Sequence, residues 1–556
     1  MSAFHLYVAF AGPPDAYVMR GGHLAFALVL AFLTMPGPLG RSATPGVLGW
    51  LLVLAAAVCA LYPTAVLSYI QNRMYYVDEP RVADYVFGGG LILLLLEATR
   101  RATGWALPVT AIVFLVYGLT LGGQSPGIML DQLYLTTEGI FGIPLYVSAT
   151  YVMLFILFGA FVERSGAGQL FMDFALALAG HTSGGPAKVA VITSSLFGTV
   201  SGSAVANVMT TGTFTIPLMK RSGYRPAFAG AVEAVASTGG QLMPPIMGAA
   251  AFVMAEFLGV SYLKVAVFAL LPALLYYLAV FMAVHFEAKR VGLKGLPRAD
   301  LPRLKQVLVE RGHLFLPLVV IIAVLLGGRS AAFAALVGTA SVIPTTWLRE
   351  STRRTFTWSV IAEAMESGAR NTVMVAMACA CAGIVIGTIT LTGLGLSFTG
   401  VVLALSQNSL FLALVLTMLA GILLGMGLPT TPAYIVQVAL LVPALVKLGL
   451  TGYIIPFMFV SAPSLLLIGD PFDVTLAALT ASIGVICLAG GLHEHFFLGR
   501  ARWWERLLLI AAALVLITPG WMTDLIGLVL IGVVCASQLA GRRADRAHAA
   551  TVADRG

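Results

Sequence analysis

Between Arg370 and Lys447 lie 76 consecutive residues without a single Asp, Glu, Lys, Arg or His. About 20 apolar residues cross a bilayer, so this segment alone predicts several crossings. The rest of the chain agrees, because it is 59% hydrophobic and only 10% charged, whereas a soluble domain carries about 25% charged residues. The sequence excludes a soluble enzyme and predicts an all-α polytopic membrane protein.

The distribution of basic residues predicts the orientation. Seven lie between Lys289 and Arg311, and four more lie in the tail from Arg542 onward. By the positive-inside rule these segments face the cytoplasm. The connection 122–144 contains Asp131 and Glu138 but no Lys or Arg, which places it outside as an acidic loop. The net charge of +8 therefore reports topology, and we expect no nucleic-acid partner.

Enzyme chemistry finds no support in the sequence. The cysteines form no CxxC pair, lie in apolar runs and are interpreted as small buried residues. The His493–His495 triplet lacks the HExxH spacing of a zinc peptidase. We expect no catalytic residues and no cofactor. The cysteines in question are Cys59, Cys379, Cys381, Cys487 and Cys535.

Apolar runs and loops divide the chain into three regions. Residues 1–121 predict a four-helix membrane domain, and 122–499 predict a transport domain. Residues 500–556 predict a helical hairpin followed by a cytoplasmic tail.

The transport domain contains a weak internal repeat. Four landmarks recur at offsets of 224 to 227 residues, among them a Gly-x-Gly at 166 and 393, a Gly/Ser turn at 201 and 425, and a late proline at 217 and 443. Such repeats build the two halves of many transporters. Generic glycine spacing in packed membrane helices is the alternative.

The segment Gly198 to Thr215 combines three glycines with many hydroxyls inside an uncharged stretch. Irregular backbone at membrane depth is tolerated only where it is buried in protein or lines a cavity. We therefore interpret Ser201-Gly202-Ser203 as the tip of a re-entrant helical hairpin. Close helix packing through small residues is the alternative.

A second irregular segment predicts a broken helix. Gly239-Gly240-Gln241 precedes Pro244-Pro245 between two apolar runs. The prolines block helical geometry in the residues before them, so we expect the carbonyls of Gly239 to Gln241 to be freed. Unwound carbonyls coordinate Na+ in transporters with broken helices. A simple kink is the alternative.

Two acidic residues lie within apolar helices of this region, Glu233 and Glu256. Intramembrane charges are functional candidates by default. A proton or ion path and an internal ion pair that stabilises helix contact are both compatible with the sequence.

Three blocks carry a family resemblance: SGSAVANVMTTGTFTIPLMKRSGY (201–224), FAGAVEAVASTGGQLMPPIMGAAAFVMAEFLG (228–259) and GMGLPTTPAYIVQ (425–437). They resemble the fused permease of tripartite ATP-independent periplasmic (TRAP) transporters paired with TAXI-type binding proteins. The resemblance covers most of the chain. It implies that small and large membrane subunits are fused in one chain, in an inverted-repeat transporter with re-entrant hairpins and broken helices.

The resemblance also implies a function and site residues. The function is secondary active import of an organic acid with Na+ across the bacterial inner membrane, with elevator-like movement of the hairpin core. A periplasmic solute-binding protein delivers the substrate, and lipid surrounds the chain. Na+ is expected at Ser203, Gly239 and Gly240. The full expected ion and substrate set is Ser201, Gly202, Ser203, Asn207, Gly239, Gly240, Gln241, Pro244, Pro245, Gly427, Pro429, Thr430 and Thr431.

One departure from the family pattern concerns the second half. A second Thr-Pro-Pro element should follow the second hairpin, but the chain passes from Gly449 directly into a segment that resembles a later part of the family. At the equivalent offset stands PSLLLIGDP (463–471), without a Gly-Gly or Pro-Pro pair. We therefore expect the second broken helix to be absent. An inactive or accessory membrane subunit derived from such a permease is the alternative function.

Overall fold

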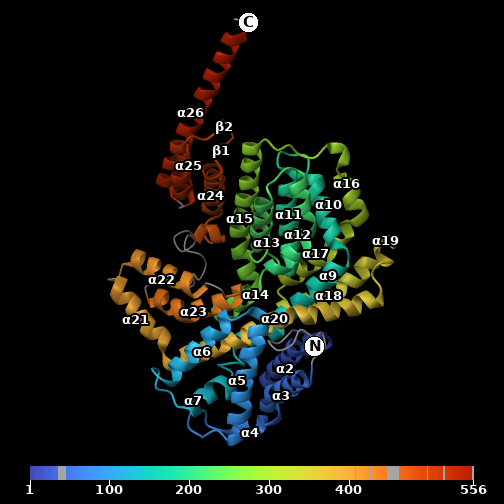
Figure 1. Cartoon of the computed structure of the whole chain (residues 1–556), viewed down its shortest axis with the longest axis vertical. Coiled ribbons are helices and arrows are strands. Elements are labelled where there is room, and N and C mark those ends of the chain that lie inside the picture. Colours follow the sequence, from blue (N-terminus) through green and yellow to red (C-terminus); the bar gives the residue numbers. More distant parts are fainter. Residues whose placement is uncertain are drawn as a thin grey trace. The chain divides into compact units, whose positions relative to one another are not determined.

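The computed structural model describes residues 1–35, 46–406, 409–425, 428–447, 463–497, 499–517 and 520–553. Figure 1 shows that these residues are almost entirely helical. Within them the only strands are β1 (His495–Phe496) and β2 (Gly499–Arg500), which pair antiparallel. Nine helical stretches in the described ranges are long and apolar enough to cross a membrane. The predicted all-α polytopic fold is confirmed.

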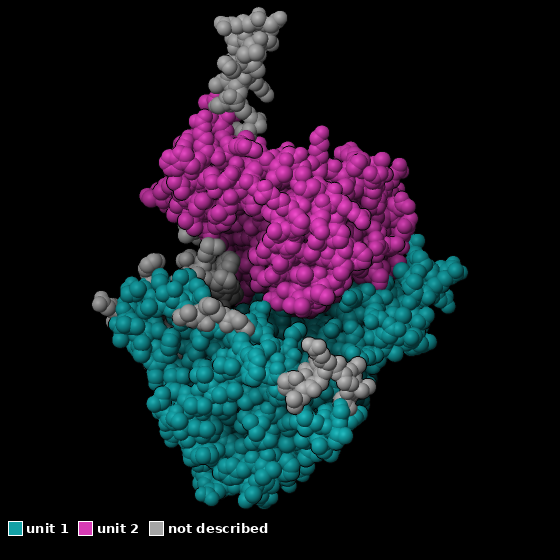
Figure 2. Space-filling model, viewed as in Figure 1, with its two compact units in different colours: residues 1–165, 248–265, 317–454 teal, residues 166–247, 266–316, 455–556 magenta. Residues whose placement is uncertain are grey.

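The chain forms two compact units that interleave along the sequence (Figure 2). Unit 1 comprises 1–165, 248–265 and 317–454, and unit 2 comprises 166–247, 266–316 and 455–556. The sequence predicts three continuous regions, 1–121, 122–499 and 500–556. This division stays a prediction.

Nineteen helical elements among the described residues belong mainly to unit 1. They are α1 (Ser2–Ala11), α2 (Ala16–Thr34), α3 (Val47–Ala65), α4 (Leu67–Asn72), α5 (Val82–Thr103), α6 (Ala106–Leu119), α7 (Pro126–Leu130), the π-helix η1 (Asp131–Leu135), α8 (Ile143–Val147), the π-helix η2 (Ser148–Val152), α9 (Met153–Arg164), α14 (Ala249–Leu258), α17 (Leu316–Leu326), α18 (Ala331–Trp347), α19 (Glu350–Arg353), α20 (Trp358–Thr392), α21 (Leu394–Ser406), α22 (Leu410–Gly425) and α23 (Thr430–Lys447).

The remaining elements belong mainly to unit 2. They are α10 (Ala167–Ala179), α11 (Gly185–Ser201), α12 (Ala204–Arg221), α13 (Pro226–Gly239), α15 (Tyr262–Val291), the 3-10 helix η3 (Arg298–Asp300), α16 (Leu304–Arg311), the 3-10 helices η4 (Gly312–Phe315) and η6 (Pro463–Leu466), α24 (Pro471–Leu492), the two strands, α25 (Trp503–Ile517) and α26 (Trp521–Ala553).

The connection 122–144, predicted as an outer loop, contains the helices α7 and η1 and is partly buried. Asp131 and Gln132 are buried, and α7 and η1 form part of the core of unit 1. The Arg73 guanidinium forms an ion pair with the Asp131 carboxylate, and both side chains are buried. Because Arg73 compensates its charge, Asp131 can be packed inside the unit. The side of the membrane that this segment faces stays a prediction.

The internal repeat is visible in helix lengths. Helices α10, α11 and α12 have 13, 17 and 18 residues, and α21, α22 and α23 have 13, 16 and 18. A glycine with positive φ precedes each series, Gly166 at +88° and Gly393 at +65°. Each third helix contains the late proline, Pro217 or Pro443. This agreement supports a duplication over generic glycine spacing.

Four of the five cysteines are buried and the fifth, Cys535, is half-buried, and none forms a disulfide. Their interpretation as small packing residues therefore holds for the four buried ones. Among the described residues no group of three His, Cys, Asp or Glu side chains is arranged to hold a metal ion.

Candidate functional site

A helix break lies where the first hairpin tip was predicted. Helix α11 ends at Ser201, Gly202 follows with φ +60°, and α12 begins at Ala204. The left-handed conformation favours glycine. The Ser203 hydroxyl accepts a hydrogen bond of 3.3 Å from the Ala206 N–H and so caps α12. Local sequence therefore explains the turn between the two helices.

The two serines at this tip differ in their hydrogen bonding. Ser203 Oγ is engaged in capping. Ser201 Oγ is buried and has no hydrogen-bond partner among the described residues. A buried hydroxyl without a partner costs free energy, so the tip holds an unused oxygen beside the start of α12.

The predicted broken helix is also present. Helix α13 ends at Gly239, α14 begins at Ala249, and residues 240–248 between them form turns. Pro244 and Pro245 lie in this break. The simple-kink alternative is excluded, because nine residues leave helical geometry.

The expectation of freed carbonyls is wrong for Gly239. Its carbonyl accepts a hydrogen bond of 3.0 Å from the Leu242 N–H, and the carbonyls of Ser237 and Thr238 accept from Gly240 and Gln241. The end of α13 thus tightens into 3-10-type bonds, which satisfy groups that a helix end otherwise exposes. A carbonyl oxygen has two lone pairs, so the Gly239 oxygen retains one for a ligand.

The hairpin and the end of α13 touch through glycines. A Cβ atom added at Gly198 would lie 2.3 Å from Gly240 Cα, and one added at Gly240 would lie 2.5 Å from Gly198 Cα. Only glycines permit this approach of two backbones. Asn207 is fully buried, and its side-chain amide donates to the Ser194 carbonyl at 2.8 Å. The structure therefore brings Asn207 of the hairpin beside Gly240 of the break.

The most prominent polar group nearby is Glu233, which lies outside the predicted site set. Its side chain is fully buried in α13. Ser194 and Ser237 donate hydroxyl hydrogen bonds to it at 2.9 and 3.1 Å, and Thr211 and Thr215 donate two more. No ion pair to Glu233 is present among the described residues. Of the two alternatives raised by the sequence, the internal ion pair is thus absent at Glu233.

The Glu233 network joins three helices. Ser194 belongs to α11, Thr211 and Thr215 to α12, and Glu233 itself to α13. The hydroxyls of Thr211 and Thr215 also lie 2.8 and 3.0 Å from the carbonyls four residues earlier. The carboxylate therefore holds both arms of the hairpin against the helix that ends at the break.

The second hairpin belongs to unit 1. Helices α22 and α23 flank it, and Gln437 of α23 donates to the Gly421 carbonyl of α22 at 2.8 Å. Pro429 lies directly before α23, and Thr430 and Thr431 form its first turn. The predicted site residue Gly427 lies outside the described residues.

Comparison with known proteins identifies the family. Residues 91–537 match the family described as "Tripartite ATP-independent periplasmic transporter, DctM component". The chain belongs to this family. The matched range covers more than half of the 556 residues.

Several relatives are large permease proteins of TRAP transporters. The chain is 35% identical over 150 residues to the C4-dicarboxylate TRAP transporter large permease protein DctM of Pseudomonas aeruginosa, covering 27% of this chain and 35% of that protein. It is 25% identical over 337 residues to the 2,3-diketo-L-gulonate TRAP transporter large permease protein YiaN of Escherichia coli, covering 59% of this chain and 76% of that protein. It is 30% identical over 149 residues to the sialic acid TRAP transporter large permease protein SiaM of Vibrio cholerae, covering 27% and 34%.

Membership of the TRAP large permease family confirms part of the sequence interpretation. The chain is a multi-pass inner-membrane protein of a transporter family, which is not an enzyme family. The fusion with a small subunit and the loss of the second broken helix stay predictions.

Proposed function

We propose that this TRAP permease imports an organic acid together with Na+, after a periplasmic solute-binding protein delivers the acid. The family and the substrates named for its relatives support an organic acid. Family membership likewise supports a soluble partner. The oxygen-rich contact between the first hairpin and the break supports Na+ as the coupling ion.

The observation that carries the proposal is the direct backbone contact of Gly198 with Gly240. It places the end of the first hairpin's leading arm against an unwound segment. Unwound carbonyls and hydroxyls are the oxygen ligands that Na+ takes in transporters with broken helices. The unpartnered Ser201 hydroxyl and the second lone pair of the Gly239 carbonyl supply two such oxygens.

The anionic substrate has its own physical requirement. The N-terminus of a helix carries partial positive charge and free N–H groups, which favour a carboxylate. Helix α12 begins at Ala204 directly behind the hairpin tip. We propose that the substrate carboxylate binds there, with Na+ beside it to compensate the negative charge.

Uptake into proteoliposomes tests the proposal. Vesicles that contain the purified full chain and its binding protein receive a labelled organic acid, with an inward Na+ gradient or an equal K+ gradient. We expect uptake with the Na+ gradient and the binding protein, and none when either is omitted. Equal uptake with K+ would reject Na+ coupling, and uptake without the binding protein would reject the tripartite arrangement.

The lengths of two corresponding intervals between helices favour a second candidate function, an inactive or accessory membrane subunit. Between α12 and α15 lie residues 222–261, which contain α13 and α14 with 14 and 10 residues. Between α23 and α24 lie only the 23 residues 448–470. This interval is one residue shorter than α13 and α14 together. Absence of any uptake under the conditions above would favour this function.

A further inference from the structure

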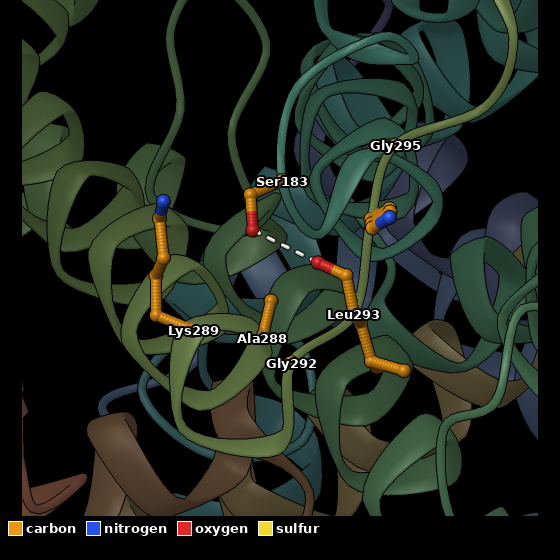
Figure 3. A pocket seen from close by; sticks show the side chains of 7 residues that line it. Ser183, Ala288, Lys289, Gly292, Leu293 and Gly295 are labelled. Atoms are coloured by element: carbon orange, nitrogen blue, oxygen red, sulfur yellow. Dashed lines mark hydrogen bonds between the residues drawn. The ribbon is translucent and has the colours of Figure 1, made fainter. Parts of the chain in front are cut away.

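A cavity of about 330 Å3 lies at the end of α15 in unit 2. Its walls are the last turn of α15, the turn 292–295 and Ser183. In the view of Figure 3, Ser183 lies between Lys289 and Gly295. The cavity is separate from the hairpin, the break and the Glu233 network.

The cavity wall is held in a fixed shape. The Leu293 N–H donates to the Ala288 carbonyl at 2.8 Å, and the Leu296 N–H donates to the Gly180 carbonyl at 2.9 Å. The Ser183 hydroxyl donates to the Leu293 carbonyl at 2.9 Å (Figure 3). A Cβ atom at Gly295 would lie 2.2 Å from the His181 carbonyl oxygen. Small-molecule sites are usually preformed in this way.

The charge of the cavity is positive and uncompensated. Lys289 and Lys294 both line it and are exposed. No described carboxylate lies within ion-pair distance of either ammonium. The nearby acids are engaged elsewhere, because Glu287 pairs with Arg290 at 2.8 Å and Glu494 pairs with Arg506 at 2.9 Å.

A third lysine adds to this positive field. The Lys188 ammonium lies 3.1 Å from both Thr182 Oγ1 and His285 Nδ1, with no carboxylate among its described partners. The charge of Lys289 acts on both Lys188 and His285. The mutual repulsion of the lysine ammonium groups is relieved by an anion bound near them.

The cavity lies at the end of a candidate membrane span. Helix α15 is one of the candidate membrane spans found among the described residues, and Lys289 and Arg290 lie in its last turn. The end of a span lies at the level of lipid headgroups. Basic pockets between helices at this level bind anionic lipid headgroups, and lysine binds phosphate as a point charge.

We propose that this cavity binds the phosphate ester of an anionic phospholipid headgroup or of a soluble phosphorylated metabolite, through Lys289 and Lys294. A volume of 330 Å3 accommodates a glycerophosphate group, since small-ligand sites begin at about 300 Å3. Both the lipid headgroup and the soluble metabolite carry the phosphate ester that the two lysines would bind.

Binding to the purified full chain in a neutral detergent tests the site. The probes are short-chain phosphatidylglycerol, short-chain phosphatidylcholine and glycerol 3-phosphate, titrated at constant ionic strength while tryptophan fluorescence and thermal stability are recorded. The double variant Lys289→Gln/Lys294→Gln removes both cavity charges. The control Arg303→Gln/Lys305→Gln removes two exposed charges of the same basic segment outside the cavity.

We expect phosphatidylglycerol to bind the wild type and the control alike, and to bind the cavity variant roughly 30-fold more weakly, from about 1 kcal/mol for each lysine. Glycerol 3-phosphate binding with the same variant dependence would assign the site to soluble esters as well, and binding by phosphatidylglycerol alone would assign it to lipid. Equal affinity of wild type and cavity variant for both phosphate probes would overturn the proposal, as would equal binding of phosphatidylcholine. Thermal unfolding without ligand shows whether each variant is folded.

Discussion

Adding one methyl group at Gly198 should separate the first hairpin from the broken helix. In Gly198→Ala the new carbon would lie 2.3 Å from Gly240 Cα, whereas carbon atoms pack at about 3.5–4.0 Å. The obstacle is backbone, so Gly198 of α11 and Gly240, directly after α13, must move apart by roughly 1.2–1.7 Å. Overpacking of this kind costs about 1–3 kcal/mol.

The separation also weakens the network between these helices. The Ser194 hydroxyl of α11 bonds the Glu233 carboxylate of α13 at 2.9 Å, and hydrogen bonds to charged groups contribute about 1.5–3 kcal/mol each. Together the two effects destabilise unit 2 by about 2.5–6 kcal/mol. A displacement of about 1 Å in a binding site lowers activity by up to about 100-fold. We therefore expect lower thermal stability in detergent and at least about 10-fold slower Na+-driven uptake.

A matched control lies on α13 itself. A Cβ atom at Gly230 would meet nothing within 4 Å, and alanine stabilises a helix interior by about 0.5–1 kcal/mol relative to glycine. Gly230→Ala should therefore melt at or slightly above the wild-type temperature and transport normally. Wild-type stability and uptake of Gly198→Ala would refute the close backbone contact.

Three further predictions concern the site and the topology. Gly240→Val, and the double change of Pro244 and Pro245 to Ala, should abolish coupled uptake while the protein still inserts; wild-type Na+ dependence in both would reject the broken-helix site. Glu233→Ala should lower thermal stability more than Glu233→Gln, because each buried hydroxyl left without an acceptor costs about 1–3 kcal/mol, and equal melting temperatures would contradict the network. Single cysteines in place of the exposed residues Ser125 and Lys294, in a cysteine-free background, should react with impermeant reagents from opposite sides of the membrane, and same-sided reaction would defeat the positive-inside assignment.

Local sequence predicts the features that depend on backbone chemistry. The break at Gly202 and the end of α13 at Gly239 were predictable, because glycine and paired prolines restrict backbone geometry within a few residues. The repeat was predictable for the same reason, since its landmarks are glycines and prolines.

Features that depend on distant partners were not predictable. Asp131 is buried because Arg73, 58 residues earlier, compensates its charge, and the charge pattern of 122–144 alone does not reveal this partner. The role of Glu233 requires the packing of α11 and α12 against α13, which spacing along one helix does not reveal. The hydroxyl-rich composition of 198–215 was the available signal, since buried hydroxyls need an acceptor.

The number of Na+ ions carried with each substrate tests the central proposal most directly. Each half of an inverted repeat supplies oxygen ligands to a shared site, and we expect the second half of this chain to lack its broken helix. Reversal potentials in proteoliposomes with the binding protein give the ratio of ions to substrate. We predict a potential that shifts with the Na+ gradient and yields fewer Na+ ions per substrate than a relative with two broken helices. A reversal potential that ignores the Na+ gradient, or a ratio equal to that of such a relative, would contradict the account.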